Sequence, residues 1–378
     1  RGTNSAKWDS LLATFGQEDL LPLWVADMDF KAPKCVRDAL HQAVEQGAFG
    51  YYRVPDAYYE SILGWEKTQH GTCLQREWIR TTSGVVSGLF QLIQAITAPG
   101  DGILVQIPVY YPFYRVIRNT GRRAVYHPLT ERNGIYTVDL EQFEQTIVAQ
   151  RPKLFLLCSP HNPVGRVWRE EELRGMLACC QRHQVQVVSD EIHHDILMPG
   201  HRHCSATRLW QGEGKPITFF SASKTFNIAG LQQATAVSFA PALLEKLERV
   251  CGEAGVTSGN TFALAATRAA YTACDDWLDG LLSYLAENRA ALEAWVKRYL
   301  PRARLTPVEA TYLAWLDLRA YGKSCDELTA LFWKQGVKLS EGNFFGPEGE
   351  GFMRLNFGCP QGMIEEGLRR MARALEEE

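Results

Sequence analysis

The sequence has no long hydrophobic run and no marked excess of charge of either sign. No apolar stretch approaches the roughly 20 residues that a membrane-spanning helix needs, and the first ten residues, RGTNSAKWDS, lack the apolar segment of a signal peptide. A formal net charge of −3 gives no electrostatic footprint for nucleic acid or for an anionic membrane. We therefore expect neither a membrane protein nor a nucleic-acid-binding protein.

The sequence also lacks cysteine pairs at a recognisable spacing. Its ten cysteines are scattered, with no C-x-x-C pair and no repeated interval. This pattern is more typical of reduced thiols than of a disulfide framework, so we expect a cytoplasmic protein. Five possible metal ligands lie close together in sequence: His193, His194, His201, His203 and Cys204. Their i, i+1 and i, i+2 spacings do not resemble a tetrahedral zinc site, so no metal is expected.

The sequence does have the length and composition of a soluble globular protein with two domains. It contains 378 residues, of which 46% are hydrophobic and 22% charged. Short apolar runs alternate with helical patterns through its middle part, which favours a mostly parallel sheet covered on both sides. The runs expected to be strands include Ile103–Tyr110, Leu154–Cys158 and Ile217–Phe220, and a helix is expected at Glu170–His183.

The pattern changes after Tyr271. Long helices and isolated strands follow, which is typical of a smaller α+β domain. The elements expected there are helices at Asp276–Leu300, Ser324–Gln335 and Met363–Glu377 and strands at Tyr312–Leu318 and Phe352–Gly358. We predict a large domain over residues 41–275 and a small domain formed by residues 1–40 and 276–378.

The stretch ITFFSASKTFNIAGL (Ile217–Leu231) places a lysine, Lys224, shortly after a buried strand. Only small residues separate the strand from this lysine, so its side chain is expected to be poorly solvated. Poor solvation favours the neutral amine, which is the nucleophile that forms a Schiff base. A surface lysine in a strand-to-helix loop is the alternative that this stretch alone leaves open.

Four further residues of distinct chemistry fall near predicted strand ends: Gly84, Tyr110, Asn162 and Asp190. Ligands of parallel sheets bind at the carboxyl ends of the strands. Gly84 and Val85 would begin a helix, where free N–H groups and the helix dipole attract phosphate. Asp190 could keep the pyridinium nitrogen of pyridoxal 5′-phosphate (PLP) protonated while Lys224 holds the cofactor as an imine.

Each of these residues also has an ordinary structural interpretation. Asp190 could cap a helix, Asn162 could be a turn residue before Pro163, and Tyr110 could simply pack. Their occurrence together at one sheet edge favours the cofactor interpretation.

Three motifs carry a more specific resemblance: SxHNPxGRVW at Ser159–Trp168, SDEIHxD at Ser189–Asp195 and SASKTFNIAGL at Ser221–Leu231. Together they resemble fold-type I PLP-dependent enzymes of the aminotransferase superfamily. WVADMDF, FGYYR, GVVSG, IPVYYPF and FMRLNFGCP narrow the resemblance to the cystathionine β-lyase (C–S lyase) subgroup. The similarity runs from Trp24 to Pro360. It implies an α/β fold with a large domain built on a mostly parallel seven-stranded sheet and a smaller α+β domain.

The resemblance also implies roles for individual residues. Lys224 would be the Schiff-base lysine and the shuttling acid/base, Asp190 would pair with the pyridine nitrogen, and Asn162 with the phenolic oxygen. Tyr110 would cover the ring and is the candidate that assists the leaving thiolate. Arg354 in FMRLNFG would bind the substrate α-carboxylate, which suits guanidinium geometry, with a salt-bridged strand arginine as the alternative.

The remaining cofactor-binding positions implied are Gly84, Val85, Val86, Ser221, Ser223, His193 and Tyr51. Tyr51 would reach the phosphate of a neighbouring subunit, which implies a homodimer. One residue departs from the pattern of many aminotransferases. Their phosphate-binding arginine, eight residues after the lysine, is replaced here by Gln232, which weakens a simple transaminase interpretation.

The implied reaction is α,β-elimination of L-cystathionine or a related cysteine S-conjugate to a thiol, pyruvate and ammonia, within sulfur amino-acid metabolism and methionine biosynthesis. An aminotransferase with the same cofactor remains an alternative, distinguished by its need for a 2-oxo acid. A regulatory protein acting through protein–protein binding is an alternative of another class.

Overall fold

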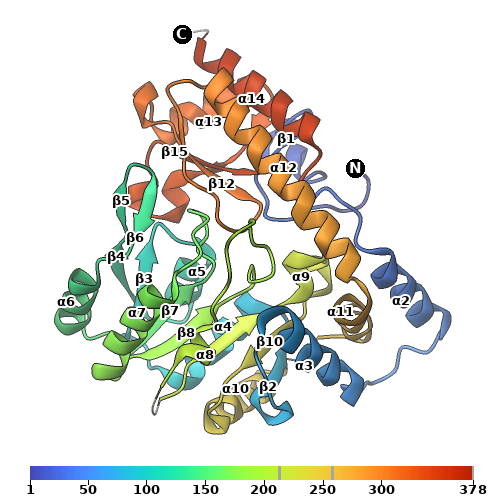
Figure 1. The fold of residues 1–378 in the computed structure, drawn as a ribbon. Coiled ribbons are helices and arrows are strands. Elements are labelled where there is room, and N and C mark those ends of the chain that lie inside the picture. Colours follow the sequence, from blue (N-terminus) through green and yellow to red (C-terminus); the bar gives the residue numbers. More distant parts are fainter. Residues whose placement is uncertain (212–213, 257–258, 377–378) are drawn as a thin grey trace.

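The computed structural model describes residues 1–211, 214–256 and 259–376, and a seven-stranded sheet lies at the centre of it (Figure 1). The strand order is β2-β10-β9-β8-β7-β3-β4. The strands are β2 (Ile79–Thr82), β3 (Gly102–Ile107), β4 (Arg123–Pro128), β7 (Leu154–Cys158), β8 (Gln186–Asp190), β9 (Ile217–Phe220) and β10 (Ala234–Val237). β10 runs antiparallel to both β2 and β9, and the other pairs are parallel, so the six strands other than β10 end at the same edge. The predicted mostly parallel sheet is confirmed.

The inner strands are apolar on both faces because helices cover both faces. In β7 every residue is buried, and its successive side chains enter two different hydrophobic clusters. Leu154 and Leu156 join the cluster of α4 (Val85–Ile96), α5 (Pro112–Asn119) and α10 (Pro241–Glu253), whereas Phe155 and Leu157 join that of α6 (Leu140–Gln150), α7 (Glu170–Arg182) and α8 (Ala206–Leu209). This is the alternation of a strand buried on both sides.

A second, four-stranded antiparallel sheet is built from the C-terminal part of the chain. Its strands, in the order β11-β12-β15-β14, are β11 (Arg304–Leu305), β12 (Leu313–Asp317), β15 (Phe352–Asn356) and β14 (Ser340–Glu341). Helices α12 (Asp275–Tyr299), α13 (Cys325–Lys334) and α14 (Gln361–Glu376) accompany it (Figure 1). The predicted terminal helix is therefore present, although its expected last residue, Glu377, lies outside the described residues.

The N-terminal segment belongs spatially with this C-terminal part. After α1 (Leu11–Phe15), the two residues of β1 (Leu21–Pro22) pair in parallel with β13 (Val337–Lys338). The remaining elements are α2 (Lys34–Glu45), α3 (Asp56–His70), the hairpin β5 (Thr130–Arg132) and β6 (Ile135–Thr137), α9 (Ala222–Thr225) and α11 (Thr261–Ala273). Five short 3₁₀ turns complete the assignment among the described residues: Arg76–Trp78, Ala229–Leu231, Arg319–Tyr321, Gly342–Phe345 and Pro347–Gly349. The division into two domains at residues 40 and 275 stays a prediction.

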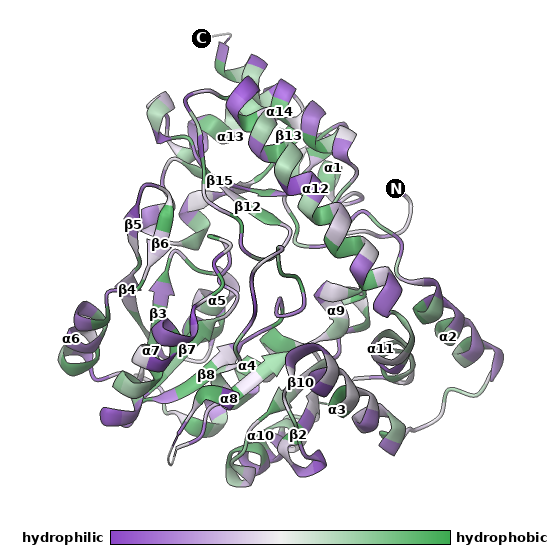
Figure 2. Cartoon of the chain, viewed as in Figure 1, coloured by the Kyte–Doolittle hydropathy of each residue, from purple (hydrophilic) through white to green (hydrophobic). Residues whose placement is uncertain are grey.

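Hydropathy follows this architecture. Apolar residues lie on the inner strands, while helices such as α12 and α14 carry both hydrophilic and hydrophobic residues along their length (Figure 2). In the part of the chain that the structure describes, no helix combines the length and the apolar character that a membrane crossing requires.

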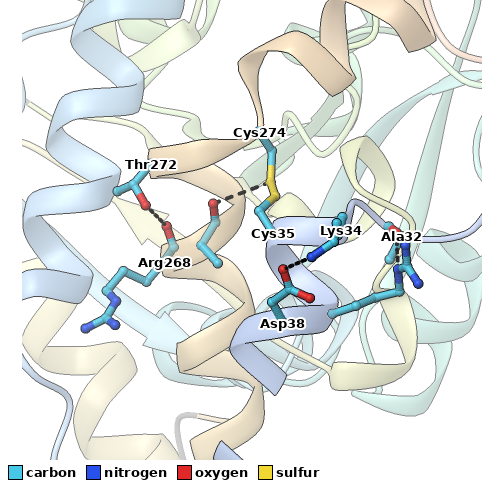
Figure 3. Close-up of a disulfide and its surroundings, with 9 residues drawn as sticks. Ala32, Lys34, Cys35, Asp38, Arg268, Thr272 and Cys274 are labelled. Carbon is cyan, nitrogen blue, oxygen red and sulfur yellow. Dashed lines mark hydrogen bonds and ion pairs between the residues drawn. A yellow bond between two sulfur atoms is a disulfide. The ribbon is translucent and has the colours of Figure 1, made fainter. Parts of the chain in front are cut away.

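The expectation that all ten cysteines are reduced is wrong for one pair. Cys35 of α2 is disulfide-bonded to Cys274, the residue just before α12, while the other eight cysteines are free (Figure 3). The two half-cystines are separated by 239 positions in the sequence. Spacing could not reveal the bond, because the two residues meet only when the chain folds α2 against α11.

The approach of α4 to β9 is close and depends on one glycine, Gly88. A Cβ atom added there would lie 2.5 Å from Cε1 of Phe219 and 3.0 Å from Oγ1 of Thr82. We expect Gly88→Ala to lower the free energy of unfolding by about 1–3 kcal/mol, the usual effect of overpacking a core. Urea unfolding followed by circular dichroism measures the change.

The matched control is Gly64→Ala in α3, where an added Cβ meets no atom within 4 Å. This substitution should stabilise the protein by about 1 kcal/mol through helix propensity alone. If Gly88→Ala raised the urea midpoint as Gly64→Ala does, close packing of α4 on β9 would not be required.

Candidate active site

Lys224 lies in the four-residue helix α9, directly beyond the carboxyl end of β9. Ser221 begins this helix: its Oγ accepts a hydrogen bond from the Ser223 N–H at 3.0 Å and donates one to the Gln233 carbonyl at 2.5 Å. The Lys224 Nζ donates to the Ala26 carbonyl at 2.6 Å, and the Tyr312 hydroxyl donates to the same oxygen at 3.0 Å. The alternative of a surface lysine in a loop is therefore wrong.

The electrostatic surroundings of Lys224 favour its neutral form. Burial lowers the pKa of its amine from 10.5 to about 8, and the Arg354 guanidinium acts in the same direction. The carboxylates of Asp27 and Asp190 oppose this shift. Lys224 is half-buried as a residue and its amine is poorly solvated, as expected from the sequence, so a substantial fraction of the amine is unprotonated at mildly alkaline pH.

Asp190 is the last residue of β8 and only 3% of its surface is exposed. Burial raises the pKa of its carboxyl to about 7, although the Ile192 N–H donates to Oδ1 at 3.1 Å and Lys224 lowers the pKa. Turns and not a helix follow Asp190, so its interpretation as a helix cap is wrong. A buried carboxyl with a raised pKa is one that a cationic partner would hold ionised, which fits a pyridinium N–H.

Arg354 enters the site from the other sheet, on β15. Its Nη1 donates to Oδ1 of Asn162 at 3.2 Å, and its Nη2 donates to the Trp24 carbonyl at 2.8 Å and to Ser340 Oγ at 3.2 Å. The Nε atom is buried and has no hydrogen-bond partner among the described residues. Burial lowers the pKa of the guanidinium to about 10, and no carboxylate pairs with it among those residues. An unpaired N–H on a buried guanidinium fits an incoming carboxylate.

Tyr110 and His193 complete this cluster. Burial and the nearby Asp190 carboxylate raise the pKa of the Tyr110 phenol, which therefore stays protonated. His193 is 3% exposed and packs edge-on against Tyr312, with ring centroids 5.9 Å apart. Burial, together with the positive charges of Lys224 and Arg354, keeps the pKa of His193 well below its usual range, so the ring is neutral. These couplings and contacts bring together Lys224, Asp190, Asn162, Tyr110, His193 and Arg354.

The start of α4 lies at the same sheet edge and fits a phosphate group. Gly84 precedes the helix with φ +106°, and its lack of a side chain leaves the helix start without a side-chain cap. The N–H groups of Val85 and Val86 then have no acceptor within the helix, which is the usual anion site. Thr82, at the end of β2, pairs with Ala234 of β10, next to the Gln233 carbonyl that binds Ser221. The predicted phosphate-binding residues Gly84, Val85, Val86, Ser221 and Ser223 therefore share one edge.

Tyr51 is different, because its side chain is fully exposed and does not join the Lys224 cluster of its own chain. Gln232 is also exposed and adopts a left-handed backbone conformation, φ +54°. Within this chain, the candidate phosphate site therefore consists of backbone N–H groups and hydroxyls.

Sequence reasoning missed two partners of the site, Tyr312 and Asn227. Asn227 adopts φ +56°, and its side chain hydrogen bonds to the backbone of Met28 and Phe30. Both side chains hydrogen bond to the backbone of the segment Trp24–Phe30, which is the motif WVADMDF of the sequence. The carbonyl acceptors of that segment could not be seen in its side-chain pattern.

The mostly parallel seven-stranded sheet is that of the fold-type I PLP-dependent enzymes. The lysine at its carboxyl edge, beside a buried acid and a helix start, is the arrangement of their site. The chain belongs to the aminotransferase class I and II family, whose model matches residues 18–371.

The similar proteins include C–S lyases. The chain is 41% identical to cystathionine beta-lyase PatB of Bacillus subtilis, in an alignment that covers 99% of this chain and 97% of that protein. It is 34% identical to protein MalY of Escherichia coli, in an alignment that covers 99% of this chain and 96% of that protein. The crystal structure of a PLP-bound C–S lyase from Staphylococcus hominis superposes with a TM-score of 0.92 at 32% identity, covering 99% of this chain and 96% of that one. The resemblance stated from the motifs is confirmed.

The pKa of Lys224 gives a direct test of the site. In cofactor-free protein, the rate of Lys224 acetylation by acetic anhydride should rise with pH with a midpoint near 8, because only the neutral amine reacts. Free Nα-acetyl-lysine, with a pKa of about 10.4, is the control. At pH 8 its neutral fraction is roughly 100-fold smaller, so it should react roughly 100-fold more slowly if the two neutral amines are equally reactive. Peptide mass spectrometry measures the extent of modification. A midpoint near that of the free amino acid would contradict the described desolvation.

Proposed function

We propose that the chain is a PLP-dependent C–S lyase that carries out α,β-elimination on L-cystathionine and related cysteine S-conjugates. The observation that carries the proposal is the buried Lys224 amine, with its lowered pKa, in one cluster with Asp190 and the incompletely paired Arg354. The names of the similar proteins, cystathionine beta-lyase and C–S lyase, support the reaction class.

The residues at the sheet edge have the donor set that PLP requires. Lys224 would hold the aldehyde carbon, Asp190 the ring nitrogen, Asn162 the phenolic oxygen, and the start of α4 with Ser221 and Ser223 the phosphate. Tyr110 and His193, both neutral, would lie against the ring. When bound, PLP supplies an electron sink that stabilises the carbanion formed at the substrate Cα.

The protein side chains would then bind and orient the amino acid. Arg354 would use its unpaired Nε–H, with a neighbouring N–H, to bind the α-carboxylate, a charge-assisted contact worth about 1.5–3 kcal/mol. Fixing the carboxylate orients the Cα–H bond toward the Lys224 amine. Orientation of this kind lowers the entropic part of the barrier.

The proton transfers follow from the protonation states. Once the substrate amine has taken its place, the freed Lys224 amine would take the Cα proton, and the Cβ–S bond would break as the thiolate leaves with the bond's electron pair. Tyr110, whose raised pKa keeps it protonated, is the candidate that delivers a proton toward the departing sulfur. Addition of water to the three-carbon remainder gives pyruvate and ammonia. Cystathionine and water thus give homocysteine, pyruvate and ammonia.

We further propose that the active site is completed in a homodimer. The loop FGYYR carries exposed aromatic side chains: Phe49 is 61% exposed, and Tyr51 is fully exposed. Contiguous exposed aromatic residues are typical of an interaction surface. Tyr51 would then serve the phosphate of the partner's site.

The test of the function is product formation without an amino-group acceptor. PLP-loaded protein given L-cystathionine and no 2-oxo acid should release pyruvate and free thiol in equal amounts, measured with lactate dehydrogenase and a thiol reagent. Lys224→Ala should fold, as judged by circular dichroism, and release neither product. Dependence of turnover on an added 2-oxo acid, without ammonia release, would identify an aminotransferase instead. Elimination at the wild-type rate by Lys224→Ala would contradict the proposal that this lysine holds the cofactor and takes the Cα proton.

Arg354→Lys tests carboxylate binding separately from proton transfer. A lysine keeps the charge but loses the planar pair of N–H donors, so kcat/KM for L-cystathionine should fall about 10–100-fold, mainly through KM. Arg298→Lys, at an exposed position in the last turn of α12, is the control and should leave both constants unchanged. An unchanged KM in Arg354→Lys would rule out Arg354 as the carboxylate ligand.

A further inference from the structure

A second cluster of ionisable side chains lies between α3 and the segment that follows β8, apart from the set assigned to the cofactor. Its members are Glu66, His70, Glu191, His194, Asp195 and His203. The sequence brings only part of it together, because Glu66 and His70 are supplied by α3, more than 100 residues earlier. The fold therefore assembles three histidines and three carboxylates.

Two ligand atoms of this cluster are buried and make no hydrogen bond of good geometry, although the second forms an ion pair with Asp195. They are Oε1 of Glu66, which is 5% exposed as a residue, and Nε2 of His194, which is 2% exposed. They face one another across 4.0 Å. Buried polar atoms are rarely left unpaired, because the loss of hydration is costly. Bonds of about 2.0–2.2 Å from a metal ion to each atom would bring the two atoms to roughly 3.4 Å in a tetrahedral site, so the side chains would close by a few tenths of an ångström on binding.

His70 supplies a third ligand at the same point. The ligand atoms of Glu66, His70 and His194 all lie within 4.8 Å of one another. The Asp195 Oδ1 atom pairs with Nε2 of His70 at 2.7 Å and with Nε2 of His194 at 3.2 Å, so a bound ion would take the place of the protons in these two contacts. A small cavity of about 10 Å³, lined in part by Glu66, His70 and His194, has room for a single ion.

We propose that Glu66, His70 and His194 bind one divalent transition-metal ion, for which Zn²⁺ is the best match, with Asp195 as the additional oxygen ligand. Imidazole and carboxylate ligands in a set of four are typical of zinc sites. The proposal revises the expectation of no metal. That expectation considered neighbours in sequence only, and of those five residues just one, His194, is a ligand here.

A neighbouring group, Glu191, His194 and His203, also meets the distance condition, but its two members other than His194 are paired with each other without an ion. Oε1 of Glu191 accepts from Ser189 Oγ and the Ala206 N–H, and Oε2 pairs with Nε2 of His203 at 2.8 Å. Its hydrogen bonds are complete, so Glu191 and His203 are better suited to support the site than to bind the ion.

The ion would join three parts of the fold. Asp195 also accepts hydrogen bonds from Trp65 Nε1 at 3.0 Å and, through Oδ2, from Thr225 Oγ1 at 2.7 Å. Thr225 is the residue after Lys224. The site therefore links α3 to the segment after β8 and to α9, which is the arrangement of a structural metal that stabilises the folded chain.

The experiment uses PLP-loaded, full-length protein without a histidine tag, freed of metal with a chelator that is then removed. Titration with Zn²⁺ by calorimetry, with metal content measured by mass spectrometry after gel filtration, should give one bound ion per chain and a higher unfolding temperature. Glu66→Gln and His70→Gln should each weaken binding by more than about 100-fold, because even changes beyond the ligands typically cost 10–100-fold. His41→Gln, on the exposed face of α2, is the control and should bind as wild type.

The proposal would be overturned if the wild type did not bind one ion per chain. It would also be overturned if Glu66→Gln and His70→Gln bound Zn²⁺ as tightly as the wild type. Loss of binding in His203→Gln but not in His70→Gln would assign the ion to the neighbouring group and also overturn it. An unchanged visible absorption of bound PLP on adding Zn²⁺ shows that the cofactor is not the ligand. If the variants did not fold, crystals of the wild type grown with Zn²⁺ would decide, through the presence or absence of an anomalous peak between Glu66 and His194.

Discussion

The backbone carbonyl groups of the irregular segment Trp24–Phe30 are the feature on which the candidate active site depends. This segment follows β1 and belongs to no strand, so its buried carbonyls need side-chain donors. Lys224 and Tyr312 donate to Ala26, Arg354 donates to Trp24, and Asn356 donates to Val25 and Asp27. Lys224 follows β9 of the seven-stranded sheet, whereas the other three donors lie on β15 or just before β12 of the four-stranded sheet. One segment therefore satisfies its own hydrogen bonds and at the same time fixes the distance between the amine and the guanidinium.

The same burial gives the two central charges opposite shifts. Loss of hydration disfavours the ammonium form of Lys224 and the carboxylate form of Asp190, so the pKa of the lysine falls while that of the aspartic acid rises. Their mutual attraction only partly offsets burial. A buried acid then lies where a cationic ring nitrogen could pair with it, and the amine loses its proton near pH 8 and not near 10.5, without a strong ion pair between the two groups.

The sequence predicted well those features that short stretches determine. The bounds expected for β7 and β9 match those observed, because each is an apolar run bounded by polar or small residues. The strand expected at Ile103–Tyr110 ends earlier, at Ile107, since Pro108 has no N–H for the sheet. Antiparallel β10, the Cys35–Cys274 bond and the meeting of Glu66 with His194 were not predicted. Each requires residues that are distant in sequence to be placed by tertiary packing, which spacing does not encode.

Helix α9 shows why the residue types around Lys224 matter as much as the lysine itself. Four residues form a single turn, far shorter than the 12–15 residues that an isolated helix needs for even marginal stability. Its position is therefore set by hydrogen bonds from the flanking polar residues. Ser221 binds the chain before β10, Thr225 binds Asp195, and Asn227 binds the N-terminal segment. These bonds hold the turn from three directions. They prevent a backbone shift that would expose the Lys224 amine to water, so the amine stays poorly solvated.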